Sequence, residues 1–223
     1  MDKATRMILT LLDYISGHAE KISSPEMVIA VKQVKKLLET SYRQLLPSLL
    51  PTLPFDAHKE IVASIDAVDH FAFMAPPNID RKAIDRLLDE SGFNKDHSHF
   101  QSTILSKELG QLVKKAEVST KVIKAWGESK EHGKIGIELF IPEESANQVK
   151  QWINRDQGAH LAFRVKNADS IDLILNILKK HHVQIPPFMN GHAMKNEGEK
   201  ISVLYCETQL GKHHFRLEFC HQN

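Results

Sequence analysis

Asp69-His70-Phe71-Ala72-Phe73 in the first half of the chain is matched by Ala159-His160-Leu161-Ala162-Phe163 in the second half. A second match follows in the same order, because Ile137-Glu138-Leu139-Phe140 has a counterpart in Leu217-Glu218-Phe219. Two duplicated pieces in one order are harder to obtain by chance than one. The sequence therefore predicts an internal repeat.

The predicted secondary structure repeats around these pieces. Each half has a strand, a helix and three further strands, and a connecting helix over 143–154 separates the halves. Gly92 is expected to close the first of these helices in a left-handed conformation. The predicted elements of the first half are strand 68–75, helix 80–91 and strands 97–105, 119–127 and 134–141. Those of the second half are strand 159–166, helix 168–182, a looser strand over 188–195 and strands 201–207 and 213–220.

The sequence before residue 66 has a helical rather than a strand-like pattern of apolar residues. Its apolar residues recur at helical spacing and predict two amphipathic helices between Asp2 and about Leu46, the second capped by Ser24. Three prolines, at 47, 51 and 54, are expected to end this region before a short helix over 57–65 that Asp56 caps. We therefore divide the chain into a helical region, 1–65, and a domain of two βαβββ modules, 66–223, with modules at about 66–142 and 157–223.

Strand alternation places the polar residues of the repeats. His70, Ala72 and Met74 share one face of their strand, and Phe71 and Phe73 take the other. Glu138 lies opposite a continuous apolar face, and Glu218 shares its face with Arg216 and Cys220. A carboxylate in an apolar strand is costly unless its charge is compensated, and a bound cation would do so.

His70, Glu138, His160 and Glu218 form a plausible ligand set for a divalent metal. Two imidazoles and two carboxylates suit zinc, iron(II), nickel or manganese, and leave positions for water or substrate. Glu138 has a second interpretation, as a general base or a residue behind the ligands while the other three hold the ion. We expect the adjacent pairs His181-His182 and His213-His214 at the surface, and His97 and His99 on a surface strand that could also line the cup.

With these residues, the chain resembles the vicinal oxygen chelate superfamily, which includes glyoxalase I, methylmalonyl-CoA epimerase and extradiol dioxygenases. The resemblance covers about residues 66–223 and implies an α+β fold, with paired βαβββ modules forming a cupped mixed sheet. It also implies metal ligands on the first and last strands of each module, where the four residues fall. The chain departs from the family at Thr208-Gln209-Leu210-Gly211, which replaces an Asp-Pro-x-Gly turn, and in the longer middle of its first module.

The resemblance implies a metal-dependent lyase or isomerase that acts on a small carbonyl substrate by metal-stabilised enolisation. Glu138 or Glu218 would then be catalytic and remove a proton from the carbon beside the carbonyl. Two alternatives stay open. One is an iron(II) dioxygenase that uses His70, His160 and Glu218, and the other is a non-catalytic module that binds a small molecule or a partner.

The composition limits the other partners. Twenty-nine basic and 28 acidic residues give a net charge of +1, which favours neither nucleic acid nor an anionic membrane. No stretch reaches the roughly 20 apolar residues that a spanning helix needs. We expect a cytoplasmic protein with two reduced cysteines and a small-molecule substrate, and whether the cup closes within one chain or across a homodimer stays open.

Overall fold

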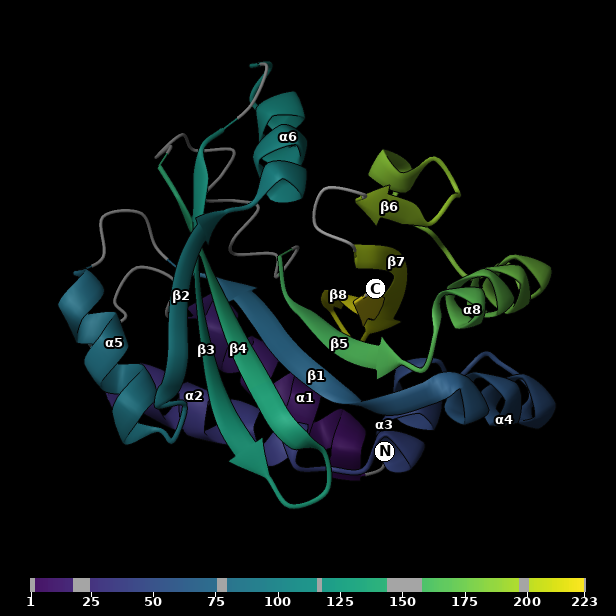
Figure 1. The fold of residues 1–223 in the computed structure, drawn as a ribbon, viewed down its shortest axis with the longest axis horizontal. Helices are drawn as coiled ribbons and strands as arrows, with labels where there is room; N and C mark the ends of the chain where they lie inside the picture. Colours follow the sequence, from purple (N-terminus) through teal and green to yellow (C-terminus); the bar gives the residue numbers. More distant parts are fainter. Residues whose placement is uncertain are drawn as a thin grey trace.

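The computed structural model describes residues 3–17, 25–75, 80–115, 118–143, 158–196 and 201–222. Its centre is a mixed sheet of eight strands in the order β2-β3-β4-β1-β5-β8-β7-β6 (Figure 1). Alternation within the strands separates the two faces of this sheet. Phe71 and Phe73 of β1 join the large core under the helices, whereas Ala72 and Met74 belong to a smaller cluster on the opposite face.

The sheet consists of two modules, as predicted. The first contains β1 (Ile65–Met74), α5 (Arg81–Glu90), β2 (Lys95–Gln101), α6 (Thr103–Leu112), β3 (Thr120–Ser129) and β4 (Gly133–Pro142). The second contains β5 (His160–Val165), α8 (Ala168–Lys180), β6 (Met194–Asn196), β7 (Ile201–Leu210) and β8 (His213–Gln222). In each module the first strand pairs in parallel with the last, and the antiparallel pair of β1 with β5 joins the modules. The paired-module α+β fold is confirmed.

Four helices precede the sheet: α1 (Lys3–Gly17), α2 (Pro25–Leu38), α3 (Tyr42–Leu49) and α4 (Phe55–Ser64). The prediction that Pro47 ends the helical region is wrong, because Pro47 lies inside α3. Burial of three leucines on that helix outweighs one lost backbone hydrogen bond. The expected cap by Asp56 is also wrong, since Pro54 is the N-cap of α4 and Asp56 lies in its first turn. Ser24 falls outside the described residues.

The N-terminal helices contact the turns of both modules. His132, in the turn between β3 and β4, has Nε2 3.1 Å from the carbonyl oxygen of Thr40, after α2. His213, which begins β8, has Nε2 3.0 Å from Oδ1 of Asp13 on α1. The predicted surface position of His213 is therefore wrong, because it is 5% exposed. The helices and the sheet share one apolar core. The domain boundary at residue 66 stays a prediction.

Two predicted strands differ in the structure. The strand over 97–105 ends at Gln101, and Ser102 instead caps α6 by accepting a hydrogen bond from the backbone N–H of Leu105. The looser strand over 188–195 is replaced by a short 3-10 helix, Pro187–Met189, and by β6, because prolines interrupt strand pairing. Gly92 has the predicted left-handed conformation, with φ of +84°. The connecting helix over 143–154 falls largely outside the described residues.

None of the described helices is long and apolar enough to span a membrane.

Candidate metal centre

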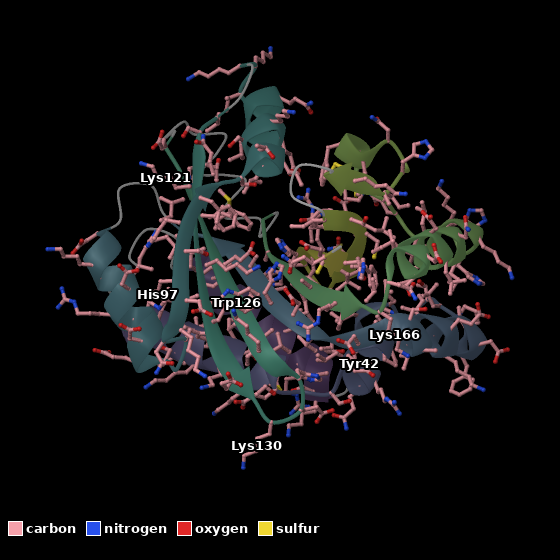
Figure 2. All side chains as sticks on the ribbon, in the orientation of Figure 1. Tyr42, His97, Lys121, Trp126, Lys130 and Lys166 are labelled. Atoms are coloured by element: carbon pink, nitrogen blue, oxygen red, sulfur yellow. The ribbon has the colours of Figure 1, made fainter. Side chains whose placement is uncertain are left out.

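A cavity of about 540 Å³ lies on the face of the sheet opposite the N-terminal helices. All four predicted ligands line it, and they come from the adjacent strands β4, β1, β5 and β8. Trp126 of β3, labelled in Figure 2, lines the same cavity. His97 lies elsewhere, where its Nε2 is 2.8 Å from the carbonyl oxygen of Phe93 and 3.3 Å from Asp89. Because both modules belong to one chain, the cup closes without a second subunit, and a homodimer stays a prediction.

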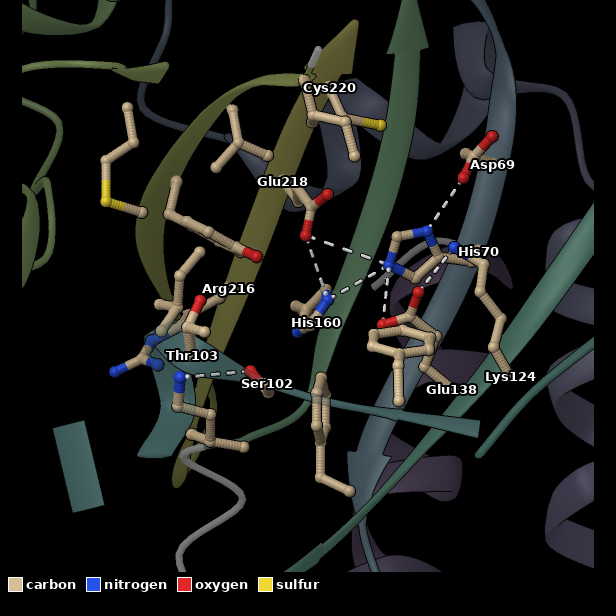
Figure 3. A pocket seen from close by; sticks show the side chains of 18 of the residues that line it. Asp69, His70, Ser102, Thr103, Lys124, Glu138, His160, Arg216, Glu218 and Cys220 are labelled. Carbon is tan, nitrogen blue, oxygen red and sulfur yellow. Dashed lines mark hydrogen bonds and ion pairs between the residues drawn. The ribbon is translucent and has the colours of Figure 1, made fainter. Parts of the chain in front are cut away.

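The pairing of β1 with β5 brings the two histidines together. Ala72 lies opposite His160 and His70 lies opposite Ala162, so both imidazoles stand on the cavity face at neighbouring positions of the ladder. Their Nε2 atoms are 3.3 Å apart and their rings meet edge to face. Both side chains are buried. Two nitrogen donors therefore point to one place, as Figure 3 shows.

Glu218 of β8 completes this group. Its Oε2 lies 3.2 Å from Nε2 of His160 and 3.8 Å from Nε2 of His70. One donor atom from each of these three residues lies within 4.8 Å of the others. Burial alone would raise the pKa of the Glu218 carboxyl, but the charge of His70 and the hydrogen bond with His160 hold that pKa far below its usual range. Glu218 is therefore a carboxylate at neutral pH.

Glu138 lies beside this group and has another partner. Its Oε1 is 2.5 Å from Nζ of Lys124, its neighbour across the β3–β4 ladder, and its Oε2 is 3.7 Å from Nε2 of His70. The Lys124 ammonium also lies 4.4 Å from the ring centre of Trp126. Burial raises the pKa of the Glu138 carboxyl, while His70 and Lys124 lower it to below its ordinary value. Lys124 thus compensates the charge of Glu138, for which the sequence alone suggested a bound metal cation.

Asp69 is a further site residue that the sequence analysis did not find. Its Oδ2 accepts a hydrogen bond from Nδ1 of His70 at 2.9 Å, and its Oδ1 lies 3.3 Å from Nη1 of Arg164. Successive residues of a regular strand point to opposite faces, but the register between β1 and β5 shifts between Val68 and His70. This bulge places both side chains on one side. The adjacency of Asp69 to His70 is visible in the sequence, but the bulge is not.

Two residues near Glu218 also line the cavity. Tyr205 of β7 packs edge to face on His160, with ring centres 5.6 Å apart, and hydrogen-bonds to Glu218. Cys220 lies on the same face as Glu218, as predicted. Burial and the charge of Asp69 raise the pKa of the Cys220 thiol well above its ordinary value. The thiol is therefore protonated, which makes it a poor nucleophile.

The chemistry of the converging group fits a divalent transition metal. Two imidazole nitrogens and one carboxylate oxygen suit zinc, iron(II), nickel or manganese. Asp69 adds the hydrogen bond that metal-binding histidines usually make through their other nitrogen. Among the described residues, this is the group of histidine, cysteine and acidic side chains whose donor atoms lie close enough to hold an ion. The predicted set of four thus comprises three converging residues and Glu138 beside them.

No protein-family model matches the sequence, and no curated protein matches it. Among solved structures, the chain is similar to a methylmalonyl-CoA epimerase in complex with methylmalonyl-CoA, with 13% identity, a TM-score of 0.42 and coverage of 70% of this chain and 95% of the epimerase. It is also similar to a mutant 4-hydroxymandelate synthase from Streptomyces coelicolor, with 12% identity, a TM-score of 0.42 and coverage of 72% and 48%. A putative glyoxalase superfamily protein from Ralstonia eutropha is similar as well, with 10% identity, a TM-score of 0.41 and coverage of 99% of this chain and 96% of that protein. In this chain the two modules are joined edge to edge through the antiparallel pair of β1 and β5.

Proposed function

We propose that the protein is a metal-dependent isomerase or lyase that enolises a small carbonyl substrate. The observation that carries this proposal is the convergence of His70, His160 and Glu218 on the wall of the cavity, with an ionised carboxylate, Glu138, next to them. A site for enolisation needs a Lewis acid at the carbonyl oxygen and a base at the neighbouring carbon. The two kinds of group are adjacent here.

The residues divide into two roles in this proposal. His70, His160 and Glu218 would hold the ion, which supplies Lewis acidity that stabilises a developing enolate oxygen. Glu138 would accept the proton through Oε2, since its other oxygen is bound by Lys124. The lowered pKa of Glu138 keeps this carboxylate in the proton-accepting form at neutral pH. Asp69 would hold the ring of His70 in place through Nδ1.

An iron(II) dioxygenase is the second candidate, and one observation favours it. The converging group has two histidines and one carboxylate, the ligand set typical of non-haem iron oxygenases. Metal identity and oxygen use separate the candidates. Oxygen consumption that requires iron(II) would favour the dioxygenase, whereas turnover under anaerobic conditions with zinc, nickel or manganese would favour the isomerase or lyase.

Elemental analysis of protein purified without a metal-chelating tag tests both enzyme proposals. We expect about one equivalent of a transition metal in the natural protein. His70→Ala and Glu218→Ala should lose it, because each removes one of three donors. Glu143→Gln is the matched control, since Glu143 pairs with the exposed Lys121.

The outcome that contradicts both enzyme proposals is a metal content below about half an equivalent that neither substitution changes. That result would favour the remaining alternative, a module that binds a small molecule without metal. Metal retained in full by Glu138→Gln would support the role of Glu138 as a base rather than a ligand, provided that the same variant has lost turnover.

A further inference from the structure

Arg216 of β8 lies on the cavity face two residues before Glu218, and a carboxylate from the other module holds it. Its Nη2 is 2.6 Å from Oε1 of Glu108 and its Nη1 is 3.0 Å from Oε2 of the same residue. Its Nε also contacts Glu207 at 3.3 Å, and its guanidinium lies 5.3 Å from the ring centre of Phe188. The side chain of Arg216 is only 14% exposed. This fork with two parallel bonds is the arrangement in which arginine binds carboxylates most strongly.

The ion pair between Glu108 and Arg216 joins the two modules at the cavity wall. Both residues line the cavity, although Glu108 comes from α6 of the first module and Arg216 from β8 of the second. Figure 1 shows α6 far from the N-terminal helices, and Figure 3 shows Arg216 near His160 and Glu218. Two other cations of the lining have partners on neighbouring strands instead, since Lys124 pairs with Glu138 and Arg164 with Asp69. Glu108 stands on α6, outside the strand ladder of the sheet.

Charged side chains of both signs line the cavity. The described lining has four carboxylates, Asp69, Glu108, Glu138 and Glu218, and four cations, Lys124, Lys134, Arg164 and Arg216. Three of these cations also pair with carboxylates beside the lining, Lys134 with Asp96, Arg164 with Asp66 and Arg216 with Glu207. A carboxylate ligand would therefore have to compete with protein carboxylates for Arg216.

We propose that Arg216 binds a carboxylate of the substrate, and that Glu108 occupies this position until the substrate displaces it. The inference rests on the proposed function for the other end of the substrate, where the carbonyl would meet the metal. Two strand residues span about 7 Å, so the substrate would be a short oxo acid or acyl compound with its carboxylate a few bonds from the carbonyl. Phe188 and the apolar side chains of the cavity wall would contact the chain between the two groups.

Calorimetric titration with succinate, and with the uncharged succinamide, tests this site. Each ligand is added to zinc-loaded and to EDTA-treated protein of natural sequence, and to the Glu108→Gln and Arg216→Gln variants. We expect succinate to bind at least about tenfold more weakly to Arg216→Gln, because a charge-assisted fork is lost. Glu108→Gln should bind it about tenfold more tightly, because the competing carboxylate is gone. Succinamide should respond to neither substitution.

The opposite signs of the two variants separate recognition from a structural role. If the ion pair only anchors α6, both substitutions loosen the helix and both weaken binding, and the proposal is overturned. Equal succinate affinity in all three proteins also overturns it. Should Arg216→Gln fail to fold, as judged by circular dichroism, the gain in Glu108→Gln and the response of Arg216→Lys decide, since lysine cannot form the fork.

The same titrations distinguish this inference from the proposed function. Succinate binding that depends on Arg216, in a protein that binds no transition metal when one is added, would support the anion site and contradict the proposed metal enzyme. Zinc binding that requires His70, together with succinate binding that does not change in Arg216→Gln, would support the metal site and contradict the carboxylate site at Arg216. Glu143→Gln serves again as the control for a loss of one surface charge.

Discussion

The carboxylate of Asp69 accepts a hydrogen bond from Nδ1 of His70 at 2.9 Å, although the two residues are consecutive in one strand. The bulge in β1 makes this contact possible, and Arg164 holds the other oxygen of the carboxylate. With Nδ1 engaged, Nε2 of His70 is the nitrogen that faces His160 and Glu218. Asp69 thus fixes both the orientation of the ring and the nitrogen available to a ligand.

Asp69→Ala is expected to weaken zinc binding by about 10- to 100-fold, because the ring of His70 loses its orientation and some basicity. Competition with a fluorescent chelator measures the affinity. Asp66→Asn is the matched control, since Asp66 also pairs with Arg164, at 3.2 Å, but makes no contact with His70 among the described interactions. Equal zinc affinities in Asp69→Ala and the control would show that Asp69 does not position the ligand.

Lys124→Met is expected to lower the free energy of unfolding of the EDTA-treated protein by about 3 kcal/mol, because the buried Glu138 then loses its ion-pair partner and keeps only His70, 3.7 Å away, to compensate its charge. Chemical denaturation measures this loss. The double variant Lys124→Met, Glu138→Gln should recover most of it, because the uncompensated charge is gone. A double variant no more stable than the single one would show that Lys124 stabilises the protein by another route.

Gly136→Ala should disturb the metal centre through packing alone. A Cβ at this position would lie 2.9 Å from the ring of Trp126 and 3.1 Å from Cβ of His70. We expect a loss of about 1 to 3 kcal/mol in unfolding free energy, together with weaker zinc binding. In a Trp152→Phe background, Trp126 is the remaining tryptophan, so its emission should shift. Adding Trp126→Leu removes the closer contact and should restore part of the stability, and failure to do so would contradict the steric explanation.

Asp13 should give the protein a measurable pH dependence at the contact between α1 and β8. The hydrogen bond from Lys212 lowers the pKa of Asp13, burial opposes it, and His213 adds to the lowering. A lowered carboxyl pKa stabilises the fold above the ordinary value near 3.8, and this stabilisation is lost as the pH falls below it. Asp13→Asn should therefore cost about 0.5 kcal/mol at pH 7 and less at low pH.

Thermal unfolding of Asp13→Asn and of the natural protein between these pH values measures the difference. Asp172→Asn, at an exposed position of α8, is the control for the loss of a surface charge. A constant difference between Asp13→Asn and the natural protein at every pH would contradict the assignment.

The faces of the strands could be predicted from the sequence because alternation decides them. Ile135, Ile137 and Leu139 had to be buried together, so Glu138 had to face the other way. The duplicated histidines and glutamates then fixed the two modules. What the sequence could not supply was the environment of each polar residue, which depends on neighbours from other strands.

Lys124 and Asp69 illustrate the missing information. Lys124 neutralises Glu138 only because the register of β3 against β4 places the two residues opposite each other. Asp69 reaches His70 only because of a bulge, which no residue pattern near position 69 announces. At α6 the local sequence favours the wrong element, because Thr103 and Ile104 favour strands, whereas Ser102 caps a helix.

The pairing of β1 with β5 ties the assembly of the candidate metal centre to the folding of the whole chain. His70 and His160 meet through the hydrogen-bond ladder of two strands that lie far apart in the sequence. A slip of one residue in that ladder would turn one imidazole toward the helices and leave the other alone. Contacts between residues so far apart in the sequence form slowly. The time at which refolding protein begins to bind zinc would therefore show when β1 and β5 pair in the correct register.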